Sequence, residues 1–240
     1  MALPYFYLSV YNPGDPQIIL DEDNSRHIVQ VLRMQKNQQM QLTDGRGWLL
    51  TATIVDDHKK KCLVRIDDAT LQPAREKKVT IALSLLKNTS RFEWFLEKAA
   101  EMGVSGIIPL LCQRTEKQHF RQDRMQNILV SALLQSQQTW LPDLRPPTPV
   151  GQVIREATQK QRYIAHCLET ERQSLAAALH KPPSSNTGGG ELILIGPEGD
   201  FTTEEIDAAL ERSFLPVTLG ETRLRTETAG VAAAALMCIR

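Results

Sequence analysis

Hydrophobic and polar residues alternate along parts of the first third of the chain, as they do in half-buried β-strands. The alternation is clearest at residues 61–66. Two further strands are expected at 40–43 and 48–55, on either side of the turn signal Asp44-Gly45. One short helix is expected near residues 25–32. This pattern predicts a small barrel or a curved sheet.

A different periodicity begins after Pro73 and the charged residues 75–78, which are typical of a linker. Between residues 91 and 103 apolar side chains recur every three to four positions, and Gly103 stands where helices often end. Strands are then expected at 79–86, 107–111, 162–166, 191–195 and 215–219, helices at 122–138, 171–179, 203–212 and 228–238, and a flexible loop at 184–190. This alternation predicts an α/β domain with a mostly parallel sheet, so the chain divides into residues 1–72 and 73–240.

The composition is that of an ordinary globular protein. Of 240 residues 42% are hydrophobic, and 28 basic residues balance 28 acidic ones. This balance argues against sequence-independent nucleic-acid binding but leaves room for a local basic face. Cys62, Cys112, Cys167 and Cys238 lie too far apart for metal-ligand or redox spacing, so reduced thiols and no metal site are expected. With no apolar run of membrane-spanning length and no signal peptide, a cytoplasmic protein with no membrane contact is expected.

Two glycine-containing turns follow two of the expected strands. The first, residues 196–199 (GPEG), leads into a helix with a capping-box pattern at Thr202–Glu205. The second, residues 220–228, is rich in arginine, threonine and glutamate, and neither turn matches a dinucleotide or triphosphate motif. Because ligands bind at the carboxyl ends of parallel strands, the pair predicts a small-molecule site near 195–200 and 219–229. The alternative for the first turn is a plain strand-to-helix connection.

These residues resemble a known family. The segments IGPEGDFTTEEI and LGETRLRTETA are similar to the C-terminal signature of the RsmE family, which reads roughly IGPEGGF and then LGxRILRTETA. The upstream stretch LLKNTSRFEWFLEKAAEMGVSGIIPLLCQRTE and the N-terminal HIVQVLRM fit the family as well, so the resemblance spans nearly the whole chain. RsmE enzymes belong to the SPOUT superfamily and methylate N3 of a uridine in 16S ribosomal RNA with S-adenosylmethionine.

The resemblance implies a fold and a cofactor site. Residues 1–72 would form an RNA-binding PUA-like β-barrel, and residues 73–240 a SPOUT domain with a mostly parallel sheet and a trefoil knot. The family works as a homodimer whose active site is completed across the interface. S-adenosylmethionine would be held largely by backbone groups of Leu194, Ile195, Gly196, Pro197, Glu198, Gly199, Leu219, Gly220, Leu224, Arg225, Thr226, Thr228 and Ala229.

The resemblance also implies the residues that act on RNA. Uridine N3 must lose its proton before it attacks the sulfonium methyl group, so an arginine near the uracil oxygens would stabilise the anion. Arg225 is the first candidate, with Arg114 and Arg223 behind it. Glu198 or Glu227 would accept the proton or orient the arginine, although either can equally be a cap or a loop ion pair. The base must be flipped or unpaired, and RNA contacts are expected at Arg26, His27, Arg33, Lys87 and Arg91.

The middle of the chain departs from the family pattern. Where the family has an acid, a glycine and two basic residues, this chain has Leu134, Gln137, Gln138 and Trp140. Trp140 would stack on a base or belong to the core, and Asp200 replaces the second glycine of GPEGG. Two alternatives stay open: a SPOUT methyltransferase for a different rRNA or tRNA base, and an RNA-binding relative that has lost catalysis.

Overall fold

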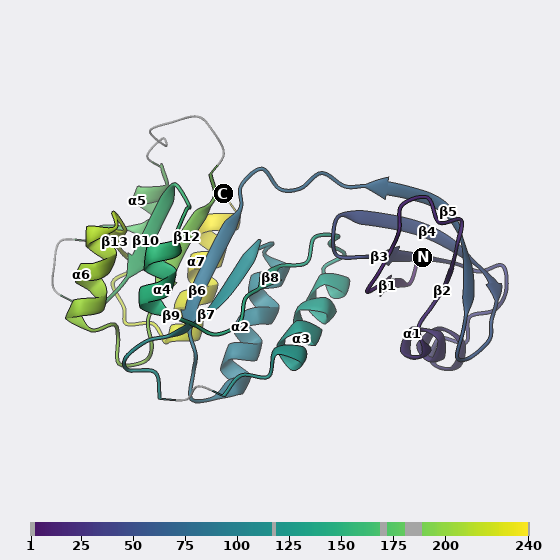
Figure 1. The fold of residues 1–240 in the computed structure, drawn as a ribbon, viewed down its shortest axis with the longest axis horizontal. Helices are drawn as coiled ribbons and strands as arrows, with labels where there is room; N and C mark the ends of the chain where they lie inside the picture. Colours follow the sequence, from purple (N-terminus) through teal and green to yellow (C-terminus); the bar gives the residue numbers. More distant parts are fainter. Residues whose placement is uncertain (1–2, 117–118, 169–171, 181–188, 240) are drawn as a thin grey trace. The chain divides into compact units, whose positions relative to one another are not determined.

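The computed structural model describes residues 3–116, 119–168, 172–180 and 189–239 (Figure 1). The chain forms two compact units. The first contains the residues up to Ala74 together with Leu133–Leu141, and the second contains Arg75–Ala132 and the residues from Pro142 onward. Each unit has its own sheet.

The sheet of the first unit has five strands in the order β1-β3-β4-β5-β2. Their bounds are Tyr5–Tyr7 (β1), Gln17–Ile19 (β2), Gln39–Thr43 (β3), Trp48–Asp56 (β4) and Leu63–Leu71 (β5). The pairings are antiparallel except that β1 joins β3 in parallel. The three longer strands confirm the expected ones, although β5 begins later and runs further. The sequence pattern does not predict β1 and β2, because three residues carry too little periodicity.

The turn between β3 and β4 follows from its Asp-Gly sequence. The Asp44 carboxylate accepts hydrogen bonds from the N–H groups of Arg46 at 2.8 Å and Trp48 at 3.2 Å. Gly45 and Gly47 both take positive φ angles, 69° and 103°, which residues with a Cβ atom adopt at a cost. The expected turn is therefore confirmed.

The helix expected near residues 25–32 is divided into two types. α1 (Glu22–Arg26) is followed without a break by the π-helical segment η1 (His27–Val31). The Asp21 carboxylate caps the first turn by accepting from the Asn24 N–H group at 2.8 Å. This cap starts the helix earlier than the apolar residues indicate.

The segment Leu133–Leu141 packs on the first unit. The N–H group of Gly47 donates to the carbonyl oxygen of Thr139 at 2.8 Å, and the Trp140 indole donates to the carbonyl oxygen of Gln72 at 3.2 Å. The Trp140 ring covers Gly47 so closely that a Cβ atom there would lie 2.5 Å from it. Because 38% of Trp140 remains exposed, the residue is not a core tryptophan.

The sheet of the second unit is parallel in every described pairing. Its order is β11-β13-β10-β12-β6-β7-β8, with β9 also paired to β7. The bounds are Val79–Ser84 (β6), Gly106–Leu111 (β7), Asp143–Leu144 (β8), Thr148–Pro149 (β9), Gln161–Ala165 (β10), Gln173–Ser174 (β11), Glu191–Ile195 (β12) and Leu215–Thr218 (β13). This confirms the expected parallel α/β sheet; the two-residue strands are too short for a sequence pattern.

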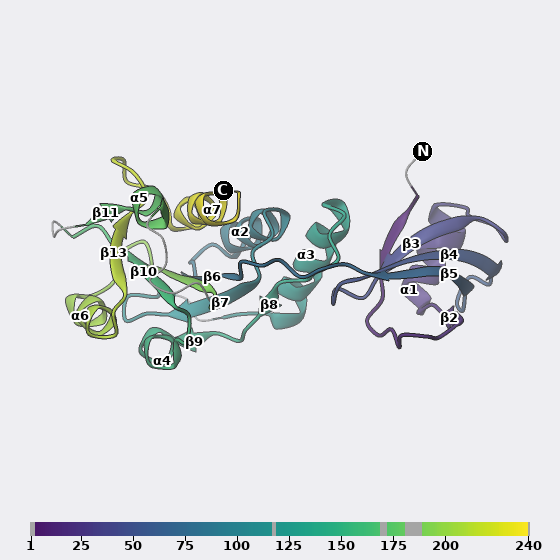
Figure 2. The same ribbon diagram turned by 90° about the horizontal axis from the view of Figure 1, so that it is seen from above.

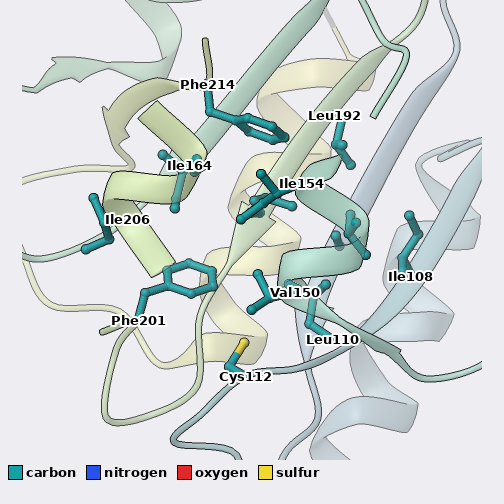
Figure 3. Close-up of a cluster of buried hydrophobic side chains, with 14 residues drawn as sticks. Ile108, Leu110, Cys112, Val150, Ile154, Ile164, Leu192, Phe201, Ile206 and Phe214 are labelled. Carbon is teal, nitrogen blue, oxygen red and sulfur yellow. The ribbon is translucent and has the colours of Figure 1, made fainter. Parts of the chain in front are cut away.

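Helices cover both faces of this sheet (Figure 2). Their bounds are Thr89–Glu101 (α2), Gln122–Gln135 (α3), Val150–Glu156 (α4), Leu175–His180 (α5), Thr203–Glu211 (α6) and Thr226–Cys238 (α7). α2 and α5 pack with α7 on one face, and α4 packs with α6 on the other. Val150 of α4 and Ile206 of α6 join Leu192 of the sheet and Phe201 in one buried cluster (Figure 3).

Two helices of the second unit differ from expectation by more than two residues at one end. The helix expected at 171–179 begins only at Leu175, because the two residues before it pair with β13 as strand β11; residue 171 lies outside the described residues. α3 ends at Gln135 rather than at residue 138, since Gln137 takes a φ angle of 54° that an α-helix cannot continue. The sequence pattern does not predict α4.

The expected loop at 184–190 falls mostly on residues that the structure does not describe, since residues 184–188 lie outside the described part of the chain. The trefoil knot stays a prediction. Among the described residues, no helix combines the length and the apolar character needed to cross a bilayer.

Candidate active site

Three loops meet at one edge of the parallel sheet. They leave β10, β12 and β13, which are neighbours in the strand order, and parallel strands have their carboxyl ends on the same edge. Together with the start of α7 and Arg91 of α2, these loops line a cavity of about 840 Å³. This volume is in the range of small-molecule sites.

The loop after β12 is held from several directions. Gly196 has little room for a side chain, because a Cβ atom there would lie 3.0 Å from the Phe201 ring. The carbonyl oxygen of Gly196 accepts the Thr226 hydroxyl at 3.1 Å. Arg114 donates to the carbonyl oxygen of Gly199 at 2.6 Å. The first glycine turn therefore has its shape set by residues distant in sequence.

The helices after the two glycine turns are capped differently. Before α6, the Thr202 N–H group donates to the Glu205 carboxylate at 2.9 Å and the Glu205 N–H group donates to the Thr202 hydroxyl at 3.3 Å, which confirms the capping box. Before α7, Arg225 occupies the N-cap position without a side-chain cap. Since Arg225 lines the cavity, the uncapped and partly positive end of α7 lies at the cavity.

The loop after β13 is more open. Gly220 has a φ angle of 153° and no atom within 4 Å of the position that a Cβ atom would occupy. The Thr218 hydroxyl donates to the carbonyl oxygen of Gly220 at 2.8 Å. Arg223 reaches the carbonyl oxygen of Glu198 at 3.4 Å, which is a weak hydrogen bond. The side chains of Arg223 and Arg225 are exposed.

Three charged side chains from different elements meet beside the cavity. Arg91 of α2 pairs with Glu198 at 3.1 Å and with Glu227 of α7 at 3.5 Å. The Glu227 side chain is only 8% exposed, and one of its oxygens has no partner among the described residues. Because two carboxylates share one guanidinium group, the cluster is negative overall and does not favour a phosphate. Arg91 therefore orients the glutamates, and its expected RNA contact stays a prediction.

The loop after β10 forms the third wall, which the sequence pattern does not identify. His166, Cys167 and Arg172 line the cavity there. His166 is 4% exposed, and neither ring nitrogen has a partner among the described residues. Burial lowers the pKa of His166, the Asp200 carboxylate partly offsets this, and Arg172 adds to the lowering. The imidazole is therefore neutral at physiological pH.

The loop after β10 was not predicted to belong to the site. Its one signal in the sequence is the strand expected at 162–166, which precedes it. No glycine turn or known motif follows that strand. Periodicity does not reveal which strands are neighbours, so its loop could not be assigned to the site. The strand order, in which β10 lies between β13 and β12, supplies that information.

Most residues expected to bind the cofactor line the cavity. They are Ile195, Gly196, Pro197, Glu198, Leu219, Gly220, Leu224, Arg225, Thr226 and Ala229. Among the described residues Leu194, Gly199 and Thr228 do not line it: Leu194 is buried within β12, and Thr228 is exposed in the first turn of α7. Arg114 also lies outside the lining and braces the β12 loop.

The residues expected to contact RNA lie in both units. Arg26, His27 and Arg33 are exposed in the first unit; Arg26 pairs with Glu22 at 2.7 Å, and Arg33 has a positive φ angle of 55°. In the second unit Lys87 pairs with Glu116 at 2.9 Å. The RNA contacts of both sets of residues stay predictions.

Cys62 and Cys112 lie outside the cavity lining. Burial raises the pKa of the Cys62 thiol to about 11 and that of the Cys112 thiol to about 12, so both are unreactive at neutral pH. In the described part of the chain, no group of three or more His, Cys, Asp or Glu residues could hold a metal ion.

Known proteins resemble this chain over both units. Residues 73–238 match the RNA methyltransferase domain family, and residues 20–67 match the RNA methyltransferase PUA domain family. A protein from Synechocystis named ribosomal RNA small subunit methyltransferase E is 29% identical over 211 residues, which cover 87% of this chain and 68% of that protein.

Two solved structures resemble the whole chain. A probable rRNA-methyltransferase from Porphyromonas gingivalis is 35% identical with a TM-score of 0.87, covering 99% of this chain and 100% of that one. A ribosomal RNA small subunit methyltransferase E from Neisseria gonorrhoeae, bound to S-adenosyl methionine, is 27% identical with a TM-score of 0.83, covering 98% and 96%. With the fold, the glycine turns and the cavity in agreement, the chain belongs to the RsmE family of RNA methyltransferases in the SPOUT superfamily.

Proposed function

We propose that this enzyme transfers a methyl group from S-adenosylmethionine to N3 of a uridine in 16S rRNA of the small ribosomal subunit, in the decoding region. The observation that carries the proposal is the convergence of both signature turns on one cavity, joined by the hydrogen bond from Thr226 to Gly196. Family membership supplies the reaction class. The Neisseria gonorrhoeae relative, whose bound ligand is S-adenosyl methionine, supports the choice of cofactor.

The residues at the cavity suit this cofactor. Gly220 leaves open space at the wall, where a larger residue would project a side chain. The uncapped N-terminus of α7 suits the cofactor's carboxylate, because a helix start favours negative charge. When bound, S-adenosylmethionine supplies an electrophilic methyl group on a sulfonium ion.

The chain's own residues prepare the uridine. Arg225 is exposed at the mouth of the cavity and stabilises the anion that forms when N3 loses its proton, with Arg114 as the second candidate. Glu198, which lines the cavity and is 52% exposed, accepts that proton or orients the arginine. Glu227 is buried against Arg91 and holds it in place.

The two parts of the chain divide the work. Residues 1–72 bind RNA through Arg26, His27 and Arg33, and residues 73–240 hold the cofactor and contact RNA through Lys87. The PUA domain match at residues 20–67 supports this division. Because the proposed substrate is ribosomal, we also propose that the enzyme acts in the cytoplasm.

A homodimer is part of the proposal. After Glu227, α7 has almost only apolar and small residues, and a helix that is apolar all round is normally buried on all sides. Val231, Ala232, Ala235 and Leu236 are nevertheless only half-buried. Trp94 of the neighbouring helix α2 is 43% exposed. A second copy of the chain would cover this surface, and light scattering would measure the dimer.

The test is methyl transfer from labelled S-adenosylmethionine to small ribosomal subunits that lack this modification, with mass spectrometry of the product nucleoside. We expect N3-methyluridine in 16S rRNA. Cofactor binding without transfer would favour a different rRNA or tRNA target. Absence of cofactor binding would favour an RNA-binding relative without catalysis.

A further inference from the structure

Asp200 occupies a backbone conformation that suits glycine better. Its φ angle is 63°, in the left-handed region, where a Cβ atom crowds the backbone. It directly follows the GPEG turn and lines the cavity. Strain of this kind persists where the side chain makes interactions that offset it.

The Asp200 carboxylate joins two of the three loops. Its Oδ2 atom accepts a hydrogen bond from the N–H group of Cys167 at 2.7 Å, and its Oδ1 atom accepts one from the N–H group of Phe201 at 2.8 Å. Cys167 belongs to the loop after β10, whereas Asp200 belongs to the loop after β12. A glycine at position 200 would leave the Cys167 N–H group without this partner.

A second residue holds the other end of the same peptide group. The Arg172 guanidinium donates to the carbonyl oxygen of His166. That carbonyl and the N–H group of Cys167 belong to a single planar peptide unit. A carboxylate therefore fixes the donor of this unit and a guanidinium fixes its acceptor, each by a charge-assisted hydrogen bond.

The peptide unit between His166 and Cys167 needs such support. It begins the cavity wall formed by the β10 loop. The His166 ring makes no hydrogen bond to the described residues that would hold the wall. The orientation of this peptide therefore depends on Asp200 and Arg172.

We propose that Asp200 is a positioning residue that fixes the His166–Cys167 peptide unit in the orientation that binds the cofactor. The inference rests on the proposed function, because the ligand concerned is its methyl donor. Preorganised loops bind ligands more tightly because less ordering is needed on binding.

Calorimetric titration with S-adenosylmethionine tests this role in the full-length protein. For Asp200→Gly we expect the Kd to rise about tenfold, the effect of losing one charge-assisted hydrogen bond. For Asp200→Asn, which tolerates left-handed backbone and keeps one acceptor oxygen, we expect a rise of about threefold. Ser213→Gly is the matched control, because Ser213 has a φ angle of 59° but lies outside the cavity lining.

Kinetics and thermal unfolding separate positioning from a purely structural role. In Asp200→Gly we expect a higher KM for the cofactor, a kcat within about twofold of the unchanged enzyme, and no fall in Tm, since glycine relieves the strain. Unchanged affinity, or an affinity loss that follows a lower Tm, would overturn the inference alone. Failure of the unchanged protein to bind the cofactor would overturn the proposed function and this inference together.

Discussion

The two signature loops of the cavity are built in opposite ways. The β12 loop is held by Thr226 and Arg114, its own Asp200 accepts from the Cys167 N–H group, and a methyl group at its first glycine would be crowded. The β13 loop has exposed arginines, an unobstructed Gly220 and a weak contact to Glu198. We therefore propose that the β12 loop holds the cofactor in a fixed position, whereas the β13 loop carries the groups that act on the substrate.

Replacement of Arg225 by alanine should produce the largest effect. If the β13 loop carries the chemistry, methyl transfer should fall about 100-fold, the usual cost of one charge-stabilising group, while the Kd for S-adenosylmethionine changes little. Single-turnover transfer and calorimetry measure the two quantities. Arg212→Ala, an exposed arginine at the end of α6, is the matched control. Unchanged transfer would contradict the role of Arg225.

Replacing Gly196 or Gly220 by alanine should lower the unfolding free energy by different amounts, because only the β12 loop is closely packed. Gly196→Ala places a Cβ atom 3.0 Å from the Phe201 ring and 3.1 Å from its N atom, so we expect a loss of about 1–3 kcal/mol in unfolding free energy. Gly220→Ala meets no atom within 4 Å, so only backbone strain remains, about 1 kcal/mol. Urea unfolding compares the two variants. Equal losses would remove the contrast between a packed and an open loop.

Two arginines should differ because one braces the rigid loop closely. Arg114→Ala removes the 2.6 Å hydrogen bond to Gly199, and we expect the KM for the cofactor to rise about fivefold. Arg223→Ala removes only a 3.4 Å contact, and we expect a change below about twofold. A fall in kcat with unchanged KM for Arg114→Ala would instead indicate a direct part in catalysis.

The smallest effect is expected on the pH dependence of thermal stability, when His166 in the loop after β10 is replaced. Because burial lowers the pKa of His166 in the folded protein, the unfolded chain binds a proton first as the pH falls below the ordinary histidine value. The stability contribution of neutral His166 is complete above that value and decreases with acidification. His166→Asn should therefore flatten the decrease in Tm between about pH 7 and pH 5. A parallel decrease in both proteins would show that other groups cause it.

Periodicity and turn chemistry allowed most elements to be predicted. The helix with Phe92, Phe95 and Leu96 on one face and Gly103 after its end formed as expected, because its stripe of apolar residues and its left-handed glycine are local signals. The turn at Asp44 and the capping box at Thr202 are local in the same sense. The GPEG and LRTET segments located two walls of the cavity for the same reason.

Features that depend on residues far apart in the sequence could not be predicted. Strands of two or three residues, such as β1 and β11, exist because neighbouring strands pair with them. The sequence allows Trp140 to be a stacking residue or a core residue, and the fold places its indole over Gly47. The sequence shows Asp200 only as a departure from the family pattern. Its role in holding Cys167 is not predictable, since Cys167 lies in another loop.

The local elements, the two glycine turns and the family signature follow from the sequence alone, because each depends on residues close together along the chain. Only the folded structure shows that β10 lies between β12 and β13, that residues after β10 line the cavity, and that Asp200 and Arg172 hold one peptide unit there. These facts require the strand order, which is set by packing among residues far apart in sequence.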